Sequence, residues 1–345
     1  MDKFFFFIIV FSLAYHQIMA GTEKRDDVNG HSVSIRQHIE QIYSNIITGN
    51  GYRLLDSVIR LPEDRDYKNG GQAPRLHEVV VFGKDNRDTA TGNGYGTLLC
   101  YPQDGKEDEQ AIQIGTATVL DVDAGTKGEV ITTAEHVLKN ITTGKVNTCY
   151  FFPDRDISRY MDNRIRVIQP VFGGYTETGN REHDWAVAII ERKVTTGMAG
   201  SHTLKFQADF DVNNVEKYLE QKHDFGILAY DLDYKDIAIS IDCRVYPHTF
   251  SEFTRNLPML YVTDCDAKSG SSGGALLYAT PGGVKAIGIY IGSFFAPGLY
   301  PQNRYPEGPP NGIPFGKDKV VNVVIKYSEN KRLLDAINSR TLLTR

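Results

Sequence analysis

The sequence lacks the features that indicate an integral membrane protein, a zinc protein or a protein that binds nucleic acids non-specifically. Beyond the first 20 residues, no apolar stretch approaches the roughly 20 residues that span a bilayer as a helix. The four cysteines form no CxxC pair, which argues against a zinc site. Acidic residues outnumber basic ones by 43 to 38, and a net charge of −5 provides no basic surface to displace counterions from phosphates. We therefore expect no metal and no nucleic-acid partner.

A short apolar run near the N-terminus predicts export. Residues 4–15 (FFFFIIVFSLAY) follow Lys3 and are too few to cross a bilayer as a helix. They fit the central region of a secretory signal, with Ala20 as the cleavage position, so residues 1–20 are predicted to be a signal peptide. We expect a protein that is secreted or periplasmic and has no membrane association after cleavage. The alternative is a buried N-terminal strand or helix.

The remaining chain divides into an extension and two blocks of short strands. The 345 residues suffice for about two domains, and 19 Tyr, 17 Phe, 32 Gly and 14 Pro favour strands and tight turns. Residues 21–79 are polar with one helix-like stretch, and we interpret them as a pro-segment or N-terminal extension. A polar linker near residue 195 separates blocks 80–195 and 196–345, and a helix capped by Ser328 ends the chain. The expected strands are 79–82, 95–100, 117–122, 129–133, 147–152 and 185–190, then 225–230, 237–245, 257–263, 274–278, 284–294 and 319–325.

An even number of cysteines in an oxidising compartment predicts up to two disulfides. Cys243 and Cys265 lie on adjacent strand-like segments and form the favoured pair, which leaves Cys100 with Cys149. Free buried thiols are the alternative for both pairs.

Three motifs contain the candidate catalytic residues. The first, residues 266–276 (DAKSGSSGGAL), places Ser272 among glycines at the start of a strand. Glycines permit a backbone that turns amides inward, so the amides of Gly270 and Ser272 could stabilise the negative oxygen formed when Ser272 attacks a carbonyl. The alternative is a flexible Gly/Ser loop.

The other two motifs contribute an imidazole and a carboxylate. In residues 130–138 (VITTAEHVL) a strand ends and a short turn presents His136. In residues 183–190 (HDWAVAII) Asp184 directly precedes an apolar strand, so its carboxylate is expected to be partly buried and to need a partner. An imidazole N–H would be a suitable partner; a structural histidine and an aspartate in a turn are the alternatives.

In their order along the chain, His136, Asp184 and Ser272, the three motifs resemble those of chymotrypsin-fold serine proteases, closest to bacterial secreted trypsin-like and glutamyl endopeptidases. The matching segments are Thr133–Val137, Asp184–Ala186 and Gly270–Gly274, and the resemblance covers about residues 80–345. It implies an all-β fold of two six-stranded antiparallel β-barrels with a C-terminal helix, preceded by the partly helical extension.

The resemblance also implies a mechanism. Ser272 would be the nucleophile, His136 the proton acceptor and Asp184 the residue that orients the imidazole, with Gly270 and Ser272 forming the oxyanion hole. No cofactor is needed, the substrate would be a protein or peptide, and the enzyme is expected to be a monomer.

Several residues depart from the family pattern. Glu135 stands where a small residue is expected and could crowd or retune His136, and Val137 replaces a cysteine. Ser271 replaces the aspartate that pairs with a freed N-terminal amine in animal members, so that ion pair cannot form here. A catalytically inactive protease-fold protein that binds a partner is therefore the rival hypothesis.

The sequence says less about substrate specificity than about the catalytic residues. Asp266 lies six residues before Ser272, where trypsins carry the carboxylate that selects Arg or Lys, although a hydrogen-bonded loop anchor explains it equally well. Tyr290 stands where glutamyl endopeptidases carry a histidine. We expect the segment with Tyr290 and Gly292 to offer backbone hydrogen bonds to an extended substrate.

Overall fold

The computed structural model describes twelve segments of the chain. These are residues 87–89, 95–101, 113–122, 128–141, 143–153, 164–194, 205–206, 225–231, 236–267, 270–280, 283–295 and 315–343. The predicted signal peptide, the 21–79 extension and the expected strand 79–82 lie outside them.

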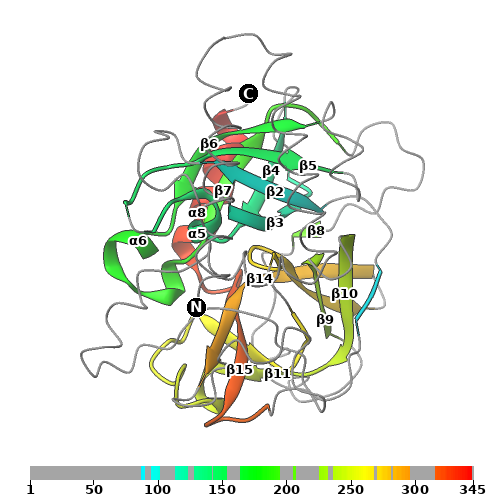
Figure 1. Cartoon of the computed structure of the whole chain (residues 1–345), viewed down its shortest axis with the longest axis vertical. Helices are drawn as coiled ribbons and strands as arrows, with labels where there is room; N and C mark the ends of the chain where they lie inside the picture. The colour runs from blue at the N-terminus through cyan, green and yellow to red at the C-terminus, as the bar shows by residue number, and fades with distance from the viewer. Residues whose placement is uncertain are drawn as a thin grey trace, which may run out of the picture.

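The first block forms a closed antiparallel barrel, in the upper half of Figure 1. Its strands follow the order β2-β3-β4-β7-β6-β5, and β2 pairs with both β3 and β5, which closes the ring. The strands are β2 (Tyr95–Tyr101), β3 (Gln113–Val119), β4 (Glu129–Thr133), β5 (Thr148–Phe152), β6 (Ile165–Phe172) and β7 (Ala186–Ile190). Strands β4 and β7 are buried at every position, so they lie within the packed interior.

The second block is a sheet that returns to its own start, below the first barrel in Figure 1. Strand β10 pairs with β9, and β11 pairs with β12, yet only Arg244 separates β10 from β11 along the chain. Counted as one bent strand, β10 and β11 close the path β9-β10/β11-β12-β15-β14-β13, because β13 pairs with β9. The strands are β9 (Phe225–Asp231), β10 (Asp236–Cys243), β11 (Val245–Pro247), β12 (Leu260–Thr263), β13 (Ala275–Thr280), β14 (Gly283–Phe295) and β15 (Val320–Lys326), flanked by β1 (Arg87–Thr89) and β8 (Lys205–Phe206).

The two blocks therefore share one strand order. In each, the first strand pairs with the second and the fourth, and the third pairs with the sixth. This arrangement confirms the expected pair of six-stranded antiparallel barrels. The described residues contain no helix that is both long and apolar enough to span a membrane.

Strand β6 was not predicted, and its sequence explains why. It contains Pro170, which argues against a regular strand, and its burial pattern does not alternate. A register irregularity lies between Ile168 and Val171, and Gln169 there has a φ of 49°. A bulge thus accommodates the proline within the ladder.

The C-terminal helix α8 (Lys331–Leu343) is present as predicted, but it begins later than expected. Asn330, not Ser328, caps it: the Asn330 side-chain oxygen accepts a hydrogen bond from the Leu333 amide at 3.2 Å. The helix packs on β7 and β4 of the first barrel, as Figure 1 shows, although it follows the second barrel in the sequence.

Both predicted disulfides are present. Cys100 and Cys149 face each other across β2 and β5, and Cys243 on β10 is bonded to Cys265 just after β12. Each bond joins two neighbouring parts of one barrel.

Candidate active site

His136 lies in a short helix that begins where β4 ends. Strand β4 stops at Thr133, Ala134 is extended, and α5 (Glu135–Leu138) follows. The hydroxyl of Thr133 donates to the carbonyl of Thr116 at 2.6 Å and so fixes the end of β4 against β3. The sequence predicted a turn here, and the structure has a single helical turn that leaves the His136 side chain 14% exposed.

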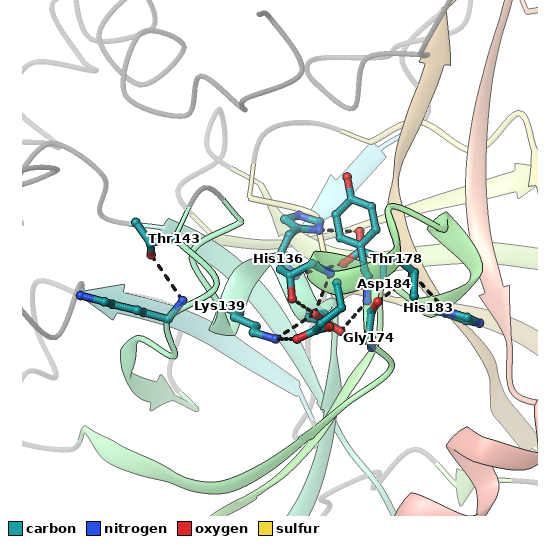
Figure 2. A network of polar contacts seen from close by, with 12 residues as sticks. His136, Lys139, Thr143, Gly174, Thr178, His183 and Asp184 are labelled. Carbon is teal, nitrogen blue, oxygen red and sulfur yellow. Dashed lines mark hydrogen bonds and ion pairs between the residues drawn. The ribbon is translucent and has the colours of Figure 1, made fainter. Parts of the chain in front are cut away.

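Asp184 lies fully buried between the short helix η3 (Arg181–His183) and β7. One carboxylate oxygen accepts the main-chain amide of His136 at 3.0 Å, and the other lies 2.8 Å from His136 Nδ1. Figure 2 shows the two side chains facing each other. A carboxylate can only accept hydrogen bonds, so the proton of the neutral imidazole is assigned to Nδ1, and Nε2 is left as an acceptor.

Ser272 lies in a turn that packs against the strand end preceding His136. Gly273 in this turn has a φ of 89°, and a Cβ at that position would lie 2.1 Å from the Thr133 hydroxyl and 3.1 Å from the Ala134 amide. The carbonyl of Ser272 accepts a hydrogen bond from the amide of Thr116 at 2.8 Å. The segments that carry His136, Asp184 and Ser272 therefore meet where the two barrels adjoin.

Glu135 does not crowd His136, which corrects the expectation from the sequence. Its fully buried carboxylate accepts hydrogen bonds from the amides of Gly174, Tyr175 and Thr176 at 2.7–3.0 Å and from the Thr176 hydroxyl at 2.6 Å. These donors belong to the start of α6 (Tyr175–Thr178), where unpaired amides favour a negative charge. Glu135 thus ties α5 to the segment leading to Asp184.

Lys139 extends the same network to the surface. Its ammonium lies 3.6 Å from Glu135 Oε1, is hydrogen-bonded to Glu177 and stands over the ring of Phe172. Figure 2 shows Lys139 within this network of polar contacts. The hydrogen bond from Lys139 lowers the pKa of the exposed Glu177 carboxyl. Because Lys139 and Glu135 are both buried, carry opposite charges and lie 3.6 Å apart, each compensates the charge of the other.

Asp266 and Gly292 lie in the second barrel, near a buried polar cluster. The amide of Asp266 donates to Ser240 Oγ at 2.8 Å, and the residue is 3% exposed. The preceding carbonyl of Cys265 accepts from Asn322 at 2.6 Å, and Asn322 in turn accepts from Ser293 and Tyr290. Gly292, with a φ of 133°, lies at the irregularity in β14 beside this cluster.

The expectation that Tyr290 offers its main chain to a substrate was wrong. Its amide donates to Gly274 and its carbonyl accepts from Gly273, so both groups already hold the nucleophile turn. Its phenol is buried, and burial raises its pKa above the ordinary range. Tyr290 is therefore a supporting residue of the turn.

Sequence reasoning missed Thr116, Ser293 and Asn322. Asn322 had a usable signal, because a lone amide in the apolar strand VVNVVIK needs a buried polar partner. Thr116 had none, since its strand, QIGTATV, contains two threonines and no feature of the sequence distinguishes one from the other.

Comparisons with known proteins find similarity among solved structures only. No family model and no curated protein matches the chain. It is similar to solved structures of protease Anisep from Arthrobacter nicotinovorans (9% identity, 74% of this chain, 99% of that chain, TM-score 0.49) and of a Glu endopeptidase in complex with MPD (17%, 76%, 100%, 0.47). A third is a thermostable serine protease, AL20, from an extremophilic microorganism (12%, 72%, 98%, 0.43). Each TM-score is below 0.5, so the interpretation of the site depends on the contacts within this chain.

Proposed function

We propose that the chain is an exported serine endopeptidase in which Ser272, His136 and Asp184 form a catalytic triad. The observation that carries the proposal is the double contact of the buried Asp184 with His136, at 3.0 Å and 2.8 Å, beside the turn that holds Ser272. An isolated buried carboxylate is costly, and its pairing with an imidazole near a glycine-flanked serine is the arrangement that activates a hydroxyl nucleophile.

In this mechanism the Ser272 oxygen attacks the carbonyl carbon of a peptide bond, and its proton passes to His136 Nε2. Asp184 holds the Nδ1–H tautomer and stabilises the imidazolium. The amides of Gly270 and Ser272 stabilise the oxygen of the tetrahedral intermediate, in keeping with the φ of 93° at Gly270. The imidazolium then protonates the leaving amine, and water hydrolyses the acyl-enzyme by the reverse sequence.

The proposal extends to substrate, location and processing. The substrate is a protein or peptide, no cofactor takes part, and the enzyme acts as a monomer outside the cytoplasm, where its two disulfides are stable. Asp266 and Gly292 are proposed to line the substrate site. Residues 21–79 are proposed to be a pro-segment, which N-terminal sequencing of active secreted protein starting at residue 21 would refute.

A fluorophosphonate probe tests the function, because it reacts covalently only with an activated serine. We expect labelling of the wild type and none of Ser272→Ala. Ser339→Ala, which removes an exposed hydroxyl on α8, is the control and should label as the wild type does. Failure of the protein to react after removal of residues 21–79 would favour the rival, a protease-fold binding protein.

A further inference from the structure

Thr116 on β3 joins the nucleophile turn to both barrels. Its fully buried hydroxyl donates to the carbonyl of Gly270 at 2.9 Å and accepts from the amide of Tyr230 on β9 at 2.8 Å. Its own amide donates to the carbonyl of Ser272 at 2.8 Å. A residue of the first barrel thus fixes two peptide groups of a turn that belongs to the second.

Tyr230 completes this arrangement from the second barrel. While its amide donates to Thr116, its carbonyl accepts from the hydroxyl of Ser271 at 3.2 Å. Thr116, Tyr230 and Ser271 are all buried, so each of these hydrogen bonds is shielded from water. We call the three residues the hydroxyl clamp, because the hydroxyls of Thr116 and Ser271 both bond to the main chain of Tyr230.

We propose that the hydroxyl clamp, and Thr116 in particular, positions the peptide groups of residues 270–272 for oxyanion stabilisation. This inference rests on the proposed serine-protease function. Oxyanion donors act only when they are aimed at the oxygen before the reaction begins, and a misplacement of about 1 Å can cost about 100-fold in rate. Thr116 is a positioning residue, because it contacts the turn and not the substrate.

The clamp has a consequence for activation. Ser271 occupies the position where the family resemblance would place an aspartate paired with a freed amine. Here its neutral hydroxyl bonds to Tyr230 instead. The clamp uses only groups internal to the folded barrels, so the clamp itself needs no new N-terminus to form.

Three variants of the exported full chain test the role of Thr116. Thr116→Val keeps the shape but removes the hydroxyl, and Thr116→Ser keeps the hydroxyl. Thr97→Val is the matched control: Thr97 faces Thr116 across β2 and β3, is 1% exposed, and its hydroxyl has no hydrogen-bond partner among the described residues.

The readout is the saturable kinetics of fluorophosphonate labelling. We expect Thr116→Val to lower the maximal inactivation rate by about 10- to 100-fold while the half-saturating probe concentration stays within about twofold. Thr116→Ser and Thr97→Val should retain the wild-type rate. A folded Thr116→Val that reacts at the wild-type rate would overturn the positioning role. If Thr116→Val does not fold, Thr116→Ala takes its place with the same expectation.

Hydrogen exchange at the Tyr230 amide separates this inference from the proposed function, because it does not depend on catalysis. Loss of the Thr116 hydroxyl should accelerate this exchange, whereas Thr97→Val should leave it unchanged. Faster exchange together with an unreactive wild type would refute the protease function and leave the contact standing. Unchanged exchange in Thr116→Val would refute the clamp itself.

Discussion

The Asp184 carboxylate contacts both the main-chain amide and the imidazole of His136. This double contact determines how the side-chain amide of an asparagine at position 184 would be oriented. The Asp184 oxygen that accepts the His136 amide must remain an acceptor, so the NH₂ of Asp184→Asn would face Nδ1. Nδ1 would then have to accept, and the proton would move to Nε2. The imidazole could no longer take the proton of Ser272.

We therefore expect Asp184→Asn to fold normally and to label with fluorophosphonate about 10⁴-fold more slowly near neutral pH. Asp335→Asn, on the exposed face of α8, is the control and should label like the wild type. Labelling of Asp184→Asn within tenfold of the wild-type rate would show that the carboxylate does not orient His136.

Glu135→Gln is expected to destabilise the protein. The single amide oxygen cannot replace a carboxylate that accepts four hydrogen bonds, and the new NH₂ would face backbone donors. Removing this buried charge also leaves Lys139 less compensated, so we predict a loss of about 3 kcal/mol in the free energy of unfolding.

Glu177→Gln is the matched comparison for Glu135, since Glu177 also pairs with Lys139 but is 59% exposed. Its loss should cost less than about 1 kcal/mol. Urea unfolding measures both changes, and equal effects would contradict the structural role assigned to Glu135.

Tyr327 makes stability sensitive to alkaline pH. Its buried phenol lies 2.6 Å from the hydroxyl of Thr132 on β4, and burial raises its pKa above the usual value. In the unfolded chain the phenol loses its proton near pH 10, whereas the folded protein retains it. The stabilising contribution is thus fully present below about pH 10 and is lost as pH rises toward the folded-state pKa.

Tyr327→Phe should therefore reduce the slope of unfolding free energy against pH above pH 10 by about 1.4 kcal/mol per pH unit. Tyr150→Phe, which removes the hydroxyl of a half-buried ring on β5, is the control for the loss of a phenol. Identical slopes for the wild type and Tyr327→Phe would contradict the assignment of the raised pKa to Tyr327.

The sequence predicted the fold well because both barrels consist of short strands separated by clear turn residues. It missed β6, where Pro170 and a bulge interrupt the regular pattern, and it placed the cap of α8 at Ser328 instead of Asn330. Secondary-structure propensity describes only local preferences, whereas the bulge in β6 and the cap of α8 depend on what these elements pack against.

The contact between His136 and Asp184 was also predictable, since each residue lies in a short motif with few alternatives, as does the proposed nucleophile Ser272. The supporting residues were not. Glu135 binds amides about 40 positions away, and Thr116 bonds to Gly270, which is 154 positions away. The Glu135 contacts form within the first barrel, and the Thr116 contact forms where the two barrels meet, so no local pattern reveals either.

Mapping the labelled residue tests the central claim most directly, because residues 269, 271 and 272 are all serines within four consecutive positions of the sequence. Tandem mass spectrometry of the fluorophosphonate adduct should place the modification on Ser272, and His136→Ala should abolish it. An adduct on Ser269 or Ser271, or labelling that persists without His136, would contradict the triad.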